Sequence, residues 1–435
     1  MSATVIRSLM PGLPGTLLGM SPETAESAAA YVAAGGYRDT AGQDRLLEHI
    51  AAAGLCGRGG AGFPVAVKLR AVRDGGVAPV VVANGEEGEP GSAKDRWLLR
   101  ARPHLVLDGL ARAAAITGAV RGYVYLSDPV AGAHVRRALA ERVPGLPVEV
   151  IETAHAYVAG EETAVVRRIN GGPALPTAKP PRPFEQGVDD RPTLVSNVET
   201  LARIALIAAR PDLRRRTALS TLVTLSGGQG TSLLAEVPYG TTLRALAAAQ
   251  GTPDATGALM GGLFGGLIDT GSLELPLDPA ALAAAGTALG CGAIRFLAPG
   301  ECPVAVAADA VGHLAAESAR QCGVCVAGTT SIRDTLRGLT TGAAVPDAVS
   351  RLLRWSTGLP GRGACGLLDA AAGTAASLLR AHPELAGAHL GSPCPACAAA
   401  PADGGRRLAV AVPEVTDTPT GFTPASAVPA LKGTP

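Results

Sequence analysis

The feature that most constrains the fold of this chain is an alternation of two kinds of segment between residues 79 and 170. Short runs rich in β-branched residues, typical of strands, lie at Pro79–Ala83, Tyr123–Leu126 and Val148–Thr153. Longer segments rich in Ala, Leu and Arg, typical of helices, lie at Ala93–Ile116, Ala131–Val143 and Thr163–Asn170. Strands that alternate with helices in this way predict an α/β sheet with helices on its faces.

In the remainder of the chain, the composition and the predicted secondary structure change several times. A Pro-rich linker at Pro173–Pro192 leads to a predicted helix at Asn197–Ala209, and from Thr221 the sequence turns to short strands and Gly turns. From Pro303 it becomes helical again, and from Gly391 its Pro, Ala, Gly and Thr content indicates an extended tail. We therefore expect an α/β domain with an N-terminal helical segment, a β-rich domain, a helical domain and a tail, bounded at 1–212, 213–300, 301–390 and 391–435.

Charge and cysteine usage narrow the class of protein. The formal net charge is +1, from 38 basic and 37 acidic residues, so no global field favours nucleic acid or an anionic membrane. The longest weakly polar stretch, Pro279–Ile294, is too short to span a bilayer, and Met1–Gly15 lacks the features of a signal peptide. Eight cysteines without an export signal favour cytosolic thiols that serve metal or redox chemistry.

A glycine-rich loop at Gly57–Gly62 formally matches the pattern G-x-G-x-x-G. It is no Rossmann fingerprint, because the segment before it, Ala41–Ala53, predicts a helix that ends near Gly54 and not a strand. Glycines still let backbone amides approach an anion or a flat ring closely, and Arg58 and Lys68 add positive charge nearby. The loop is therefore either a cofactor-binding or a purely structural element.

Three further polar segments stand at the ends of predicted strands or the starts of helices. Asn84–Gly91 holds three carboxylates after a buried strand, where they are placed either to bind the hydroxyls of a ligand or to form a solvated acidic turn. Tyr157–Thr163 and Val195–Thr200 each precede a helix, and each alone is explained as a helix start.

Together, in this order and at these intervals, the four segments resemble the flavoprotein subunit of bacterial complex I, the family of the F subunit of NADH-quinone oxidoreductase. Relatives of that subunit occur in soluble hydrogenases and formate dehydrogenases. The glycine loop resembles the family's Gly-Arg-Gly-Gly-Ala-Gly-Phe-Pro, here Gly57–Pro64, with Lys68 downstream. Gly35–Tyr37, Lys179–Pro181 and Gly286–Gly292 also resemble family segments, so the resemblance covers about residues 30 to 390.

The resemblance implies an FMN in a modified dinucleotide-binding, Rossmann-like domain, with NADH stacked on the flavin. By matching position, the implied FMN contacts are Gly57, Arg58, Gly59, Gly60, Lys68, Asn84, Glu86, Glu87, Tyr157, Gly160, Glu161, Ser196, Asn197 and Thr200. The nicotinamide nucleotide is implied to contact Phe63 and Lys179, together with Glu89 and Glu162 beside the reacting rings. The β-rich domain is implied to be a ubiquitin-like β-grasp, and the last domain a helical bundle that holds a [4Fe–4S] cluster.

The implied function is that of an NADH dehydrogenase subunit, an enzyme that takes hydride from NADH onto FMN and passes single electrons through an iron–sulfur cluster. The implied partner is a ferredoxin-like or [2Fe–2S] thioredoxin-like subunit, with a membrane-bound redox protein as a further candidate and no role for nucleic acid. The expected location is cytoplasmic, or peripheral on the inner face of the membrane. The alternative is a degenerate electron-transfer or assembly subunit that keeps the fold without efficient NADH oxidation.

The cluster motif departs from the family pattern Glu-Ser-Cys-Gly-x-Cys-x-x-Cys. Ala319 stands where the first cysteine belongs, which leaves Cys322, Cys325 and a downstream Cys365 as the implied ligands. Four thiolates normally hold such a cluster, so three leave one iron open. The open explanations are a three-iron cluster, a four-iron cluster with a non-cysteine ligand, or no cluster.

The other cysteines add alternatives. The tail's Cys394 or Cys397 is a candidate to fold back as the fourth cluster ligand, and the two are also candidates to form a zinc site with Cys322 and Cys325. His313 is a further candidate ligand. Plain packing is expected for Cys56, Cys291 and Cys302.

The residues expected to bind the nicotinamide nucleotide also differ from the family pattern. Of three family aromatics at the adenine end, Phe63 is present, while Ala71 and Arg182 replace the others. Arg182 suits either stacking on adenine or pairing with a ribose 2′-phosphate. NADH is favoured over NADPH because Glu89 and Glu162 repel a phosphate dianion.

Overall fold

The computed structural model describes residues 3–10, 16–38, 42–142, 144–228, 230–401, 403 and 405–417. Its first half is built around a four-stranded, fully parallel sheet in the order β4–β3–β2–β5. The strands are β2 (Val80–Asn84), β3 (Arg121–Leu126), β4 (Val148–Glu152) and β5 (Thr193–Asn197). This confirms the predicted α/β fold with a parallel, Rossmann-like sheet.

Helices cover both faces of this sheet, as expected for parallel strands whose two faces are both apolar. Val81 and Ala83 of β2 face the larger core, whereas Val80 and Val82 face a smaller one that includes Val165. The helices of this half are α1 (Ala28–Ala33), α2 (Gln43–Ala53), α3 (Val65–Arg73), α4 (Lys94–Ala101), α5 (Pro103–Thr117), α6 (Pro129–Glu141), α7 (Glu162–Ile169), α8 (Val198–Ala209) and α9 (Arg214–Ala218).

One predicted helix is interrupted. The segment expected as a single helix at Ala93–Ile116 forms α4 and α5, which are separated at Arg102 with φ −128° and ψ 47°. The next residue is Pro103, and the ring of a proline disfavours helical backbone at the residue before it. The Arg102 guanidinium occupies the break and pairs with Glu26 at 3.0 Å.

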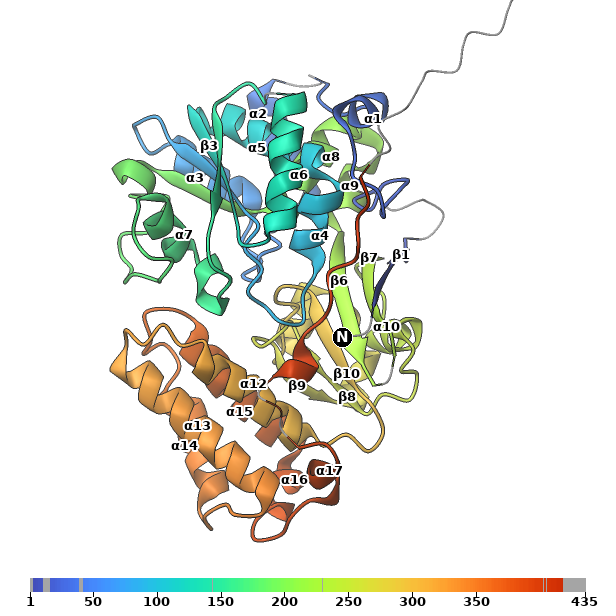
Figure 1. Cartoon of the computed structure of the whole chain (residues 1–435), viewed down its shortest axis with the longest axis vertical. Helices are drawn as coiled ribbons and strands as arrows, with labels where there is room; N and C mark the ends of the chain where they lie inside the picture. The colour runs from blue at the N-terminus through green and yellow to red at the C-terminus, as the bar shows by residue number, and fades with distance from the viewer. Residues whose placement is uncertain are drawn as a thin grey trace, which may run out of the picture.

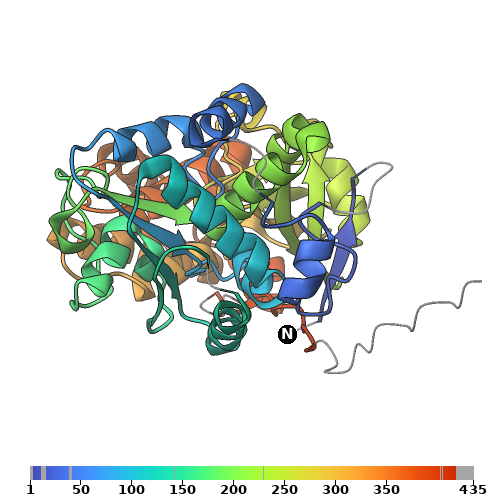
Figure 2. The ribbon, with the colours of Figure 1, turned by 90° about the horizontal axis from the view of Figure 1, so that it is seen from above.

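A second, six-stranded mixed sheet follows, in the order β1–β7–β6–β10–β8–β9. Its strands are β1 (Thr4–Ser8), β6 (Ser220–Gly227), β7 (Ser232–Pro238), β8 (Gly257–Met260), β9 (Gly266–Asp269) and β10 (Ala293–Leu297). Residues 4–8, which were expected in the first domain, lie at the edge of this sheet beside β7. The short helices α10 (Leu243–Gln250) and α11 (Pro279–Ala284) belong to the same region. In the view from above, the yellow-green strands lie beside the blue and green helices of the first half (Figure 2).

The last part of the chain is helical and lies below both sheets in Figure 1. It contains α12 (Pro303–Ala316), α13 (Gly323–Thr341), α14 (Ala348–Gly358), α15 (Leu367–Ala381), α16 (Pro383–Ala388) and α17 (Pro395–Ala399). None of the helices in the described ranges is both long enough and apolar enough to cross a bilayer.

The predicted tail is extended over only part of its described length. It first forms α17, whose Cys397 is buried, and then a short 3₁₀ helix at Arg406–Leu408. It then runs back past both sheets, where Val410 N donates to Pro90 O at 3.0 Å and Thr416 N donates to Glu23 O at 2.9 Å. Figure 1 shows this red segment passing from the helical region to the first domain.

Candidate functional site

The order of the parallel strands fixes where a ligand site is expected. The chain passes from β2 to β3 and β4 on one side of the sheet, and β5 then lies on the other side of β2. The strand order therefore reverses between β2 and β5, and open α/β sheets bind ligands outside the carboxyl ends of the strands at such a point. Asn84 and Asn197, the last residues of the two strands, are partners in the register.

The glycine loop lies directly over this point. A Cβ on Gly59 would be 3.4 Å from the Asn197 Cβ, and Arg58 N donates to Thr200 Oγ1 at 2.9 Å. The loop follows α2, which ends at Gly54 as predicted, and the backbone of Gly54 is left-handed. Residues 59–64 are exposed, and the amides of residues 59–62 make no hydrogen bond within the described chain. The loop thus offers open backbone donors to an anion.

The Arg58 side chain turns away from this open face. It is buried, and its guanidinium donates to the carbonyls of Cys56, Ala218 and Ser220 at 2.7–3.0 Å. It also lies 5.4 Å from the centre of the Tyr239 ring. The guanidinium therefore joins the loop to the second sheet, and only the backbone of Arg58 faces the predicted cofactor position.

The predicted acidic loop places its three carboxylates in different surroundings. Glu86 is buried, and neither of its carboxylate oxygens makes a hydrogen bond within the described part of the chain. The His155 Nδ1 atom lies 3.3 Å from its Oε1. A buried carboxylate without hydrogen-bond partners is costly, which favours a ligand that donates to it.

Glu87 is instead satisfied by the protein. Its oxygens accept hydrogen bonds from the Ser92 hydroxyl, the Asp95 amide and the Arg96 side chain at 2.5–3.1 Å. Burial opposes ionisation, but the Arg96 and Lys94 cations and these hydrogen bonds outweigh it and lower the pKa of Glu87. This carboxylate therefore holds the loop in shape.

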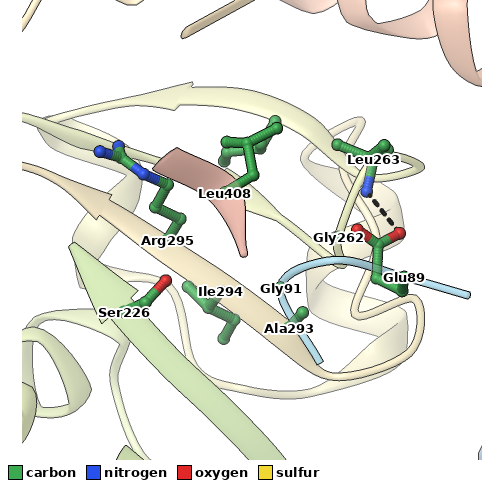
Figure 3. A pocket seen from close by; sticks show the side chains of 10 residues that line it. Glu89, Gly91, Ser226, Gly262, Leu263, Ala293, Ile294, Arg295 and Leu408 are labelled. Atoms are coloured by element: carbon green, nitrogen blue, oxygen red, sulfur yellow. Dashed lines mark hydrogen bonds between the residues drawn. The ribbon is translucent and has the colours of Figure 1, made fainter. Parts of the chain in front are cut away.

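Glu89 lies beside the loop between β8 and β9 (Figure 3). Its Oε2 accepts a hydrogen bond from Leu263 N at 3.1 Å, drawn as the dashed line. Together with Gly262, Arg295 and Leu408 it lines a small pocket. Burial raises the pKa of the Glu89 carboxyl to about 7, so that its charge changes close to neutral pH.

Gly160 and Tyr157 approach the ends of the strands from the connection after β4. Asn84 Nδ2 donates to Gly160 O at 2.8 Å, and a Cβ on Gly88 would be only 2.6 Å from the Tyr157 Cα. Ser196, the neighbour of Asn197 on β5, is half-buried at the same edge. The predicted segments are thus brought together at one end of the sheet.

Four charged residues form a cluster next to this edge. Glu161 caps α7 by accepting from Thr163 N at 2.8 Å, as its position before the helix predicted. Lys179 Nζ lies 2.7 Å from Glu161 Oε1 and 3.5 Å from Glu162 Oε1. Lys68 Nζ reaches from α3 to Val195 O at 2.8 Å and lies 3.6 Å from Glu162 Oε2. Two lysines and two carboxylates therefore stand side by side.

Phe63 completes the exposed side of the site, since 52% of its surface is accessible. An exposed aromatic ring on a glycine loop is suited to stacking on a flat base.

Lys94 and Asp95, two charged residues beneath the site, were not recognisable as site residues in the sequence. Asp95 Oδ2 accepts from Asn197 Nδ2 at 2.7 Å, and Lys94 Nζ lies 2.7 Å from Asp95 Oδ1 and 3.1 Å from Glu199 Oε2. All three charged side chains are buried. Burial raises the pKa of Asp95 to about 7 although Lys94 acts against this. Adjacent charges at a helix start predict exposure, so only the packing of α4 against β5 and α8 reveals them.

The three cysteines of the incomplete cluster motif share one pocket. Cys322, Cys325 and Cys365 line it, and Ala319 lines it too, at the place of the missing ligand. The pocket adjoins the segment between α7 and β5, because Gln321 Nε2 donates to Pro176 O at 2.8 Å.

An aromatic pair connects this pocket to the acidic loop. The Tyr157 and Phe264 rings are stacked with centroids 6.5 Å apart, and a Cβ on Gly366 would be 3.0 Å from the Phe264 ring. Gly366 follows Cys365, and Tyr157 N donates to Glu317 Oε2 at 2.9 Å. The cysteine pocket and the site at the sheet edge are therefore neighbours.

The tail cysteines do not reach this pocket, so two of the alternatives are wrong. Cys394 and Cys397 lie with Cys302 and His389, and the ligand atoms of these four residues are all within 4.8 Å of one another. They supply no fourth ligand beside Cys365, and they form no set with the cysteines at 322 and 325. The helix α17 directs both thiols towards the start of α12, which no pattern in the sequence indicated.

His313 has a different environment from the one considered for it. Its ring packs edge-to-face on Tyr157 with centroids 6.0 Å apart, and burial lowers its pKa. It is not among the residues that line the cysteine pocket.

The chain is similar to known proteins over two of the regions described above. Residues 50–206 match the Nuo51 FMN-binding domain, and residues 305–389 match the NADH-ubiquinone oxidoreductase-F iron–sulfur binding region. The second F subunit of the NADH-quinone oxidoreductase of Rhizobium meliloti is 32% identical over 79% of this chain and 90% of that protein. The HndC subunit of the NADP-reducing hydrogenase of Solidesulfovibrio fructosivorans is 30% identical over 79% of this chain and 76% of its own length.

A solved structure is also similar. It is an NAD+-reducing [NiFe]-hydrogenase in the H2-reduced state, which matches 90% of this chain and 69% of its own chain with a TM-score of 0.75 and 28% identity. The fold and the site define a flavoprotein subunit of an electron-transfer complex that oxidises nicotinamide nucleotides. The chain belongs to the family of the F subunit of NADH-quinone oxidoreductase.

This confirms the predicted family and the predicted enzyme class, an FMN-dependent NADH dehydrogenase subunit with an iron–sulfur region. The residues present fit both groups. The open amides of the glycine loop suit a phosphate, and the Glu86 oxygens, which accept no hydrogen bond in the described chain, suit ligand hydroxyls. Three thiols around one pocket suit an iron–sulfur cluster that lacks one cysteine ligand.

Proposed function

We propose that the cofactor and nucleotide contacts implied by the family apply at the carboxyl ends of β2 and β5. The open amides of residues 59–62 bind the FMN phosphate, with Lys68 as the neighbouring positive charge. Glu86 accepts hydrogen bonds from the ribityl hydroxyls, and the strand-end residues Asn84, Ser196 and Asn197 border the same position. The observation that carries this proposal is the pairing of a solvent-open glycine loop with a buried carboxylate whose nearest partner is an exposed histidine, at the sheet's switch point.

The nicotinamide nucleotide binds over the exposed side of this position. Phe63 offers a stacking surface, Lys179 pairs with Glu162 at 3.5 Å, and Glu89 belongs to the acidic loop itself. When bound, FMN would supply the conversion between the two-electron hydride of NADH and single-electron transfer. The chain's own residues bind and orient the two rings, and none of them has to act as a nucleophile.

NADH is the preferred nucleotide in this proposal. Glu162 and Glu89 add negative charge to the nucleotide side of the site, which disfavours the additional dianion of NADPH. Arg182, the residue that would favour NADPH, is exposed and its backbone amide donates to Glu185 Oε2 at 2.8 Å. Turnover with each nucleotide and an artificial one-electron acceptor tests this, and a clear preference for NADPH would contradict it.

Cys322, Cys325 and Cys365 hold the iron–sulfur cluster with one iron that lacks a cysteine ligand. The helices α12–α15 form the bundle around it, and the six-stranded sheet is a β-grasp-like domain without a cofactor of its own. The cysteine pocket adjoins the flavin side through Tyr157 and Phe264, which supports passage of electrons from the flavin towards this pocket.

The electrons leave to a partner, for which a ferredoxin-like or [2Fe–2S] thioredoxin-like subunit is the class we propose. The similar proteins are themselves subunits of quinone oxidoreductases and hydrogenases, which supports a role beside other redox subunits. Such a complex places this chain in the cytoplasm, or on the inner face of the membrane where a membrane-bound redox protein is the final partner.

The second candidate function is a degenerate subunit that transfers electrons or supports assembly without oxidising NADH efficiently. Ala319, in place of a cluster ligand, is the observation that favours it. The two functions differ in turnover with the artificial acceptor. The proposed enzyme turns over NADH even in a Cys365→Ser variant, because the acceptor takes electrons at the flavin, whereas a degenerate subunit is inactive with the cluster intact.

A further inference from the structure

A second group of sulfur and nitrogen ligands lies away from both the sheet edge and the cysteine pocket. It consists of Cys302, His389, Cys394 and Cys397, whose ligand atoms are all within 4.8 Å of one another. It is the one group of three or more cysteine, histidine or acidic residues that could hold a metal among the described residues. Three of the four side chains are buried, with Cys302 6%, His389 2% and Cys397 2% exposed.

The spacing of the atoms fits one ion and not a cluster. A tetrahedral zinc ion with ligands at about 2.0–2.3 Å places those ligand atoms about 3.5–3.8 Å apart. His389 Nε2 lies 3.3 Å from Cys302 Sγ and 3.5 Å from Cys397 Sγ. The thiolates of an iron–sulfur cluster bind separate irons and stand farther apart, as is expected for the pocket around Cys365.

The histidine is already held in the form that binds metal. Its Nδ1 lies 2.7 Å from Leu385 O, a carbonyl that can only accept, so Nδ1 carries the proton and Nε2 presents its lone pair to the thiols. Metal-binding histidines are commonly oriented by such a second hydrogen bond. The two nearest sulfurs face Nε2 and not Nδ1.

Two of the segments have positions typical of metal-binding cysteines. Cys302 directly precedes the first turn of α12. Cys394 directly precedes α17 and is separated from Cys397 by two residues. A Cys-x-x-Cys turn is a usual half of a structural zinc site.

We propose that these four residues bind one structural Zn²⁺ ion in a closed Cys₃His site. Zinc suits the set because it takes thiolate and imidazole ligands in tetrahedral geometry, and four protein ligands leave no position for a substrate. The ion is distinct from the iron–sulfur cluster and does not depend on the proposed flavin function.

The site would fix three segments that are far apart in the sequence. It joins the start of α12 to the end of α16 and to α17. The chain then continues to Leu408, which lines the pocket at Glu89, and to Val410, whose amide donates to Pro90 O at 3.0 Å. The ion would thus anchor the segment that runs back over the acidic loop.

Metal analysis of the full chain, purified under reducing conditions, tests this proposal. We expect about one zinc per chain, in addition to any iron. A Cys397→Ser variant should hold at least tenfold less zinc with its iron unchanged, while the matched Cys365→Ser variant should lose iron and keep its zinc. Zinc that survives Cys397→Ser but not Cys365→Ser would place the metal in the other pocket and overturn the proposal.

X-ray absorption at the zinc edge of the unmodified chain covers the case in which Cys397→Ser does not fold. We expect three sulfur ligands at about 2.3 Å and one nitrogen ligand at about 2.0 Å. Absence of zinc, a different ligand set, or a Cys394–Cys397 disulfide in the native protein would each overturn the proposal.

Discussion

At the scale of single residues, Glu86 gives the most direct test of the proposed FMN site. Its buried carboxylate has only the exposed His155 ring, 3.3 Å from Oε1, beside it in the described protein, so its burial is incompletely compensated until a ligand donates hydrogen bonds to it. A Glu86→Gln variant should therefore keep or gain stability as apoprotein, yet bind FMN with about 1–3 kcal/mol less free energy, that is, about tenfold to a hundredfold more weakly. Thermal unfolding and flavin fluorescence titration measure the two effects.

The matched control is Glu152→Gln, at the end of β4. Glu152 is exposed and pairs with Arg136 on the surface, so neither apoprotein stability nor FMN affinity should change by a measurable amount. Equal FMN affinity of the Glu86→Gln variant and the unmodified protein would contradict the proposed role of Glu86.

The raised pKa of Glu89 leads to a prediction about the pH dependence of stability and of NADH binding. Burial raises its pKa from 4.5 to about 7, so the folded protein binds this proton more tightly than the unfolded chain. Its contribution to stability is present below about pH 4.5 and is lost as the pH rises through 7. The newly formed charge also repels the phosphates of a nucleotide, by on the order of 1 kcal/mol.

We therefore expect KM for NADH to rise about fivefold as the pH increases through 7. In a Glu89→Gln variant this rise should disappear while kcat changes less than KM. Steady-state kinetics across this pH range checks the prediction, and an unchanged pH profile in the variant would assign the titration to another group.

At the scale of elements, the shape of the acidic loop depends on a close approach to the backbone of a neighbouring segment. A Cβ on Gly88 would be 2.6 Å from the Tyr157 Cα and 2.7 Å from the Ala156 carbonyl oxygen, both backbone atoms that cannot turn aside. Gly88→Ala should therefore displace the loop from the segment at Tyr157, cost about 1–3 kcal/mol of stability and lower the flavin content. Absorbance per chain after purification measures the flavin.

Gly91→Ala, three residues further along the same loop, is the control. A Cβ at Gly91 would meet only ordinary contacts at 3.5 Å, so flavin content and stability should stay close to those of the unmodified protein. Similar behaviour of the two variants would show that the close approach at Gly88 does not shape the site.

Some of the helices and strands could be predicted from the sequence alone, and others could not. Strands β2, β3 and β4 and helix α2 were predictable because their apolar periodicity is local. Strand β5 was not, since Thr193–Val195 is a very short apolar run before a helix and becomes a strand only by pairing with β2. That pairing creates the reversal of strand order on which the site depends.

The same limit applies to the site residues. The loops that form the site were recognisable from their motifs, but the direction of each side chain was not. Arg58 turns towards Ala218 and Ser220, which lie 160 residues or more along the chain, and Asp95 lies under Asn197. These contacts depend on packing between elements, which a motif does not encode.

At the scale of the whole molecule, the cysteine pocket and the flavin side are joined through Tyr157, Phe264 and Gly366. Ala319 occupies the place of the fourth ligand in that pocket. An Ala319→Cys variant should therefore raise the iron content towards four per chain and make the cluster more resistant to oxidative loss. Iron and sulfide assays with electron paramagnetic resonance check this.

The matched control is Ala316→Cys, at the end of α12, because Ala316 is exposed and does not line the pocket. Its iron content should equal that of the unmodified chain. The flavin content of the Ala319→Cys variant should also stay constant, because Ala319 is not one of the proposed FMN contacts. An iron content that Ala319→Cys leaves unchanged would mean that another group already completes the cluster, or that the pocket holds none.

The central claim is that this chain oxidises NADH on a flavin bound over β2 and β5. The visible spectrum of the anaerobic, FMN-loaded protein before and after addition of NADH tests it most directly. We predict that the visible absorbance of the oxidised flavin falls on the time scale of one turnover after NADH is mixed in. The fall should be more complete with NADH than with NADPH. Flavin that remains oxidised with both nucleotides would contradict this claim and favour the degenerate subunit.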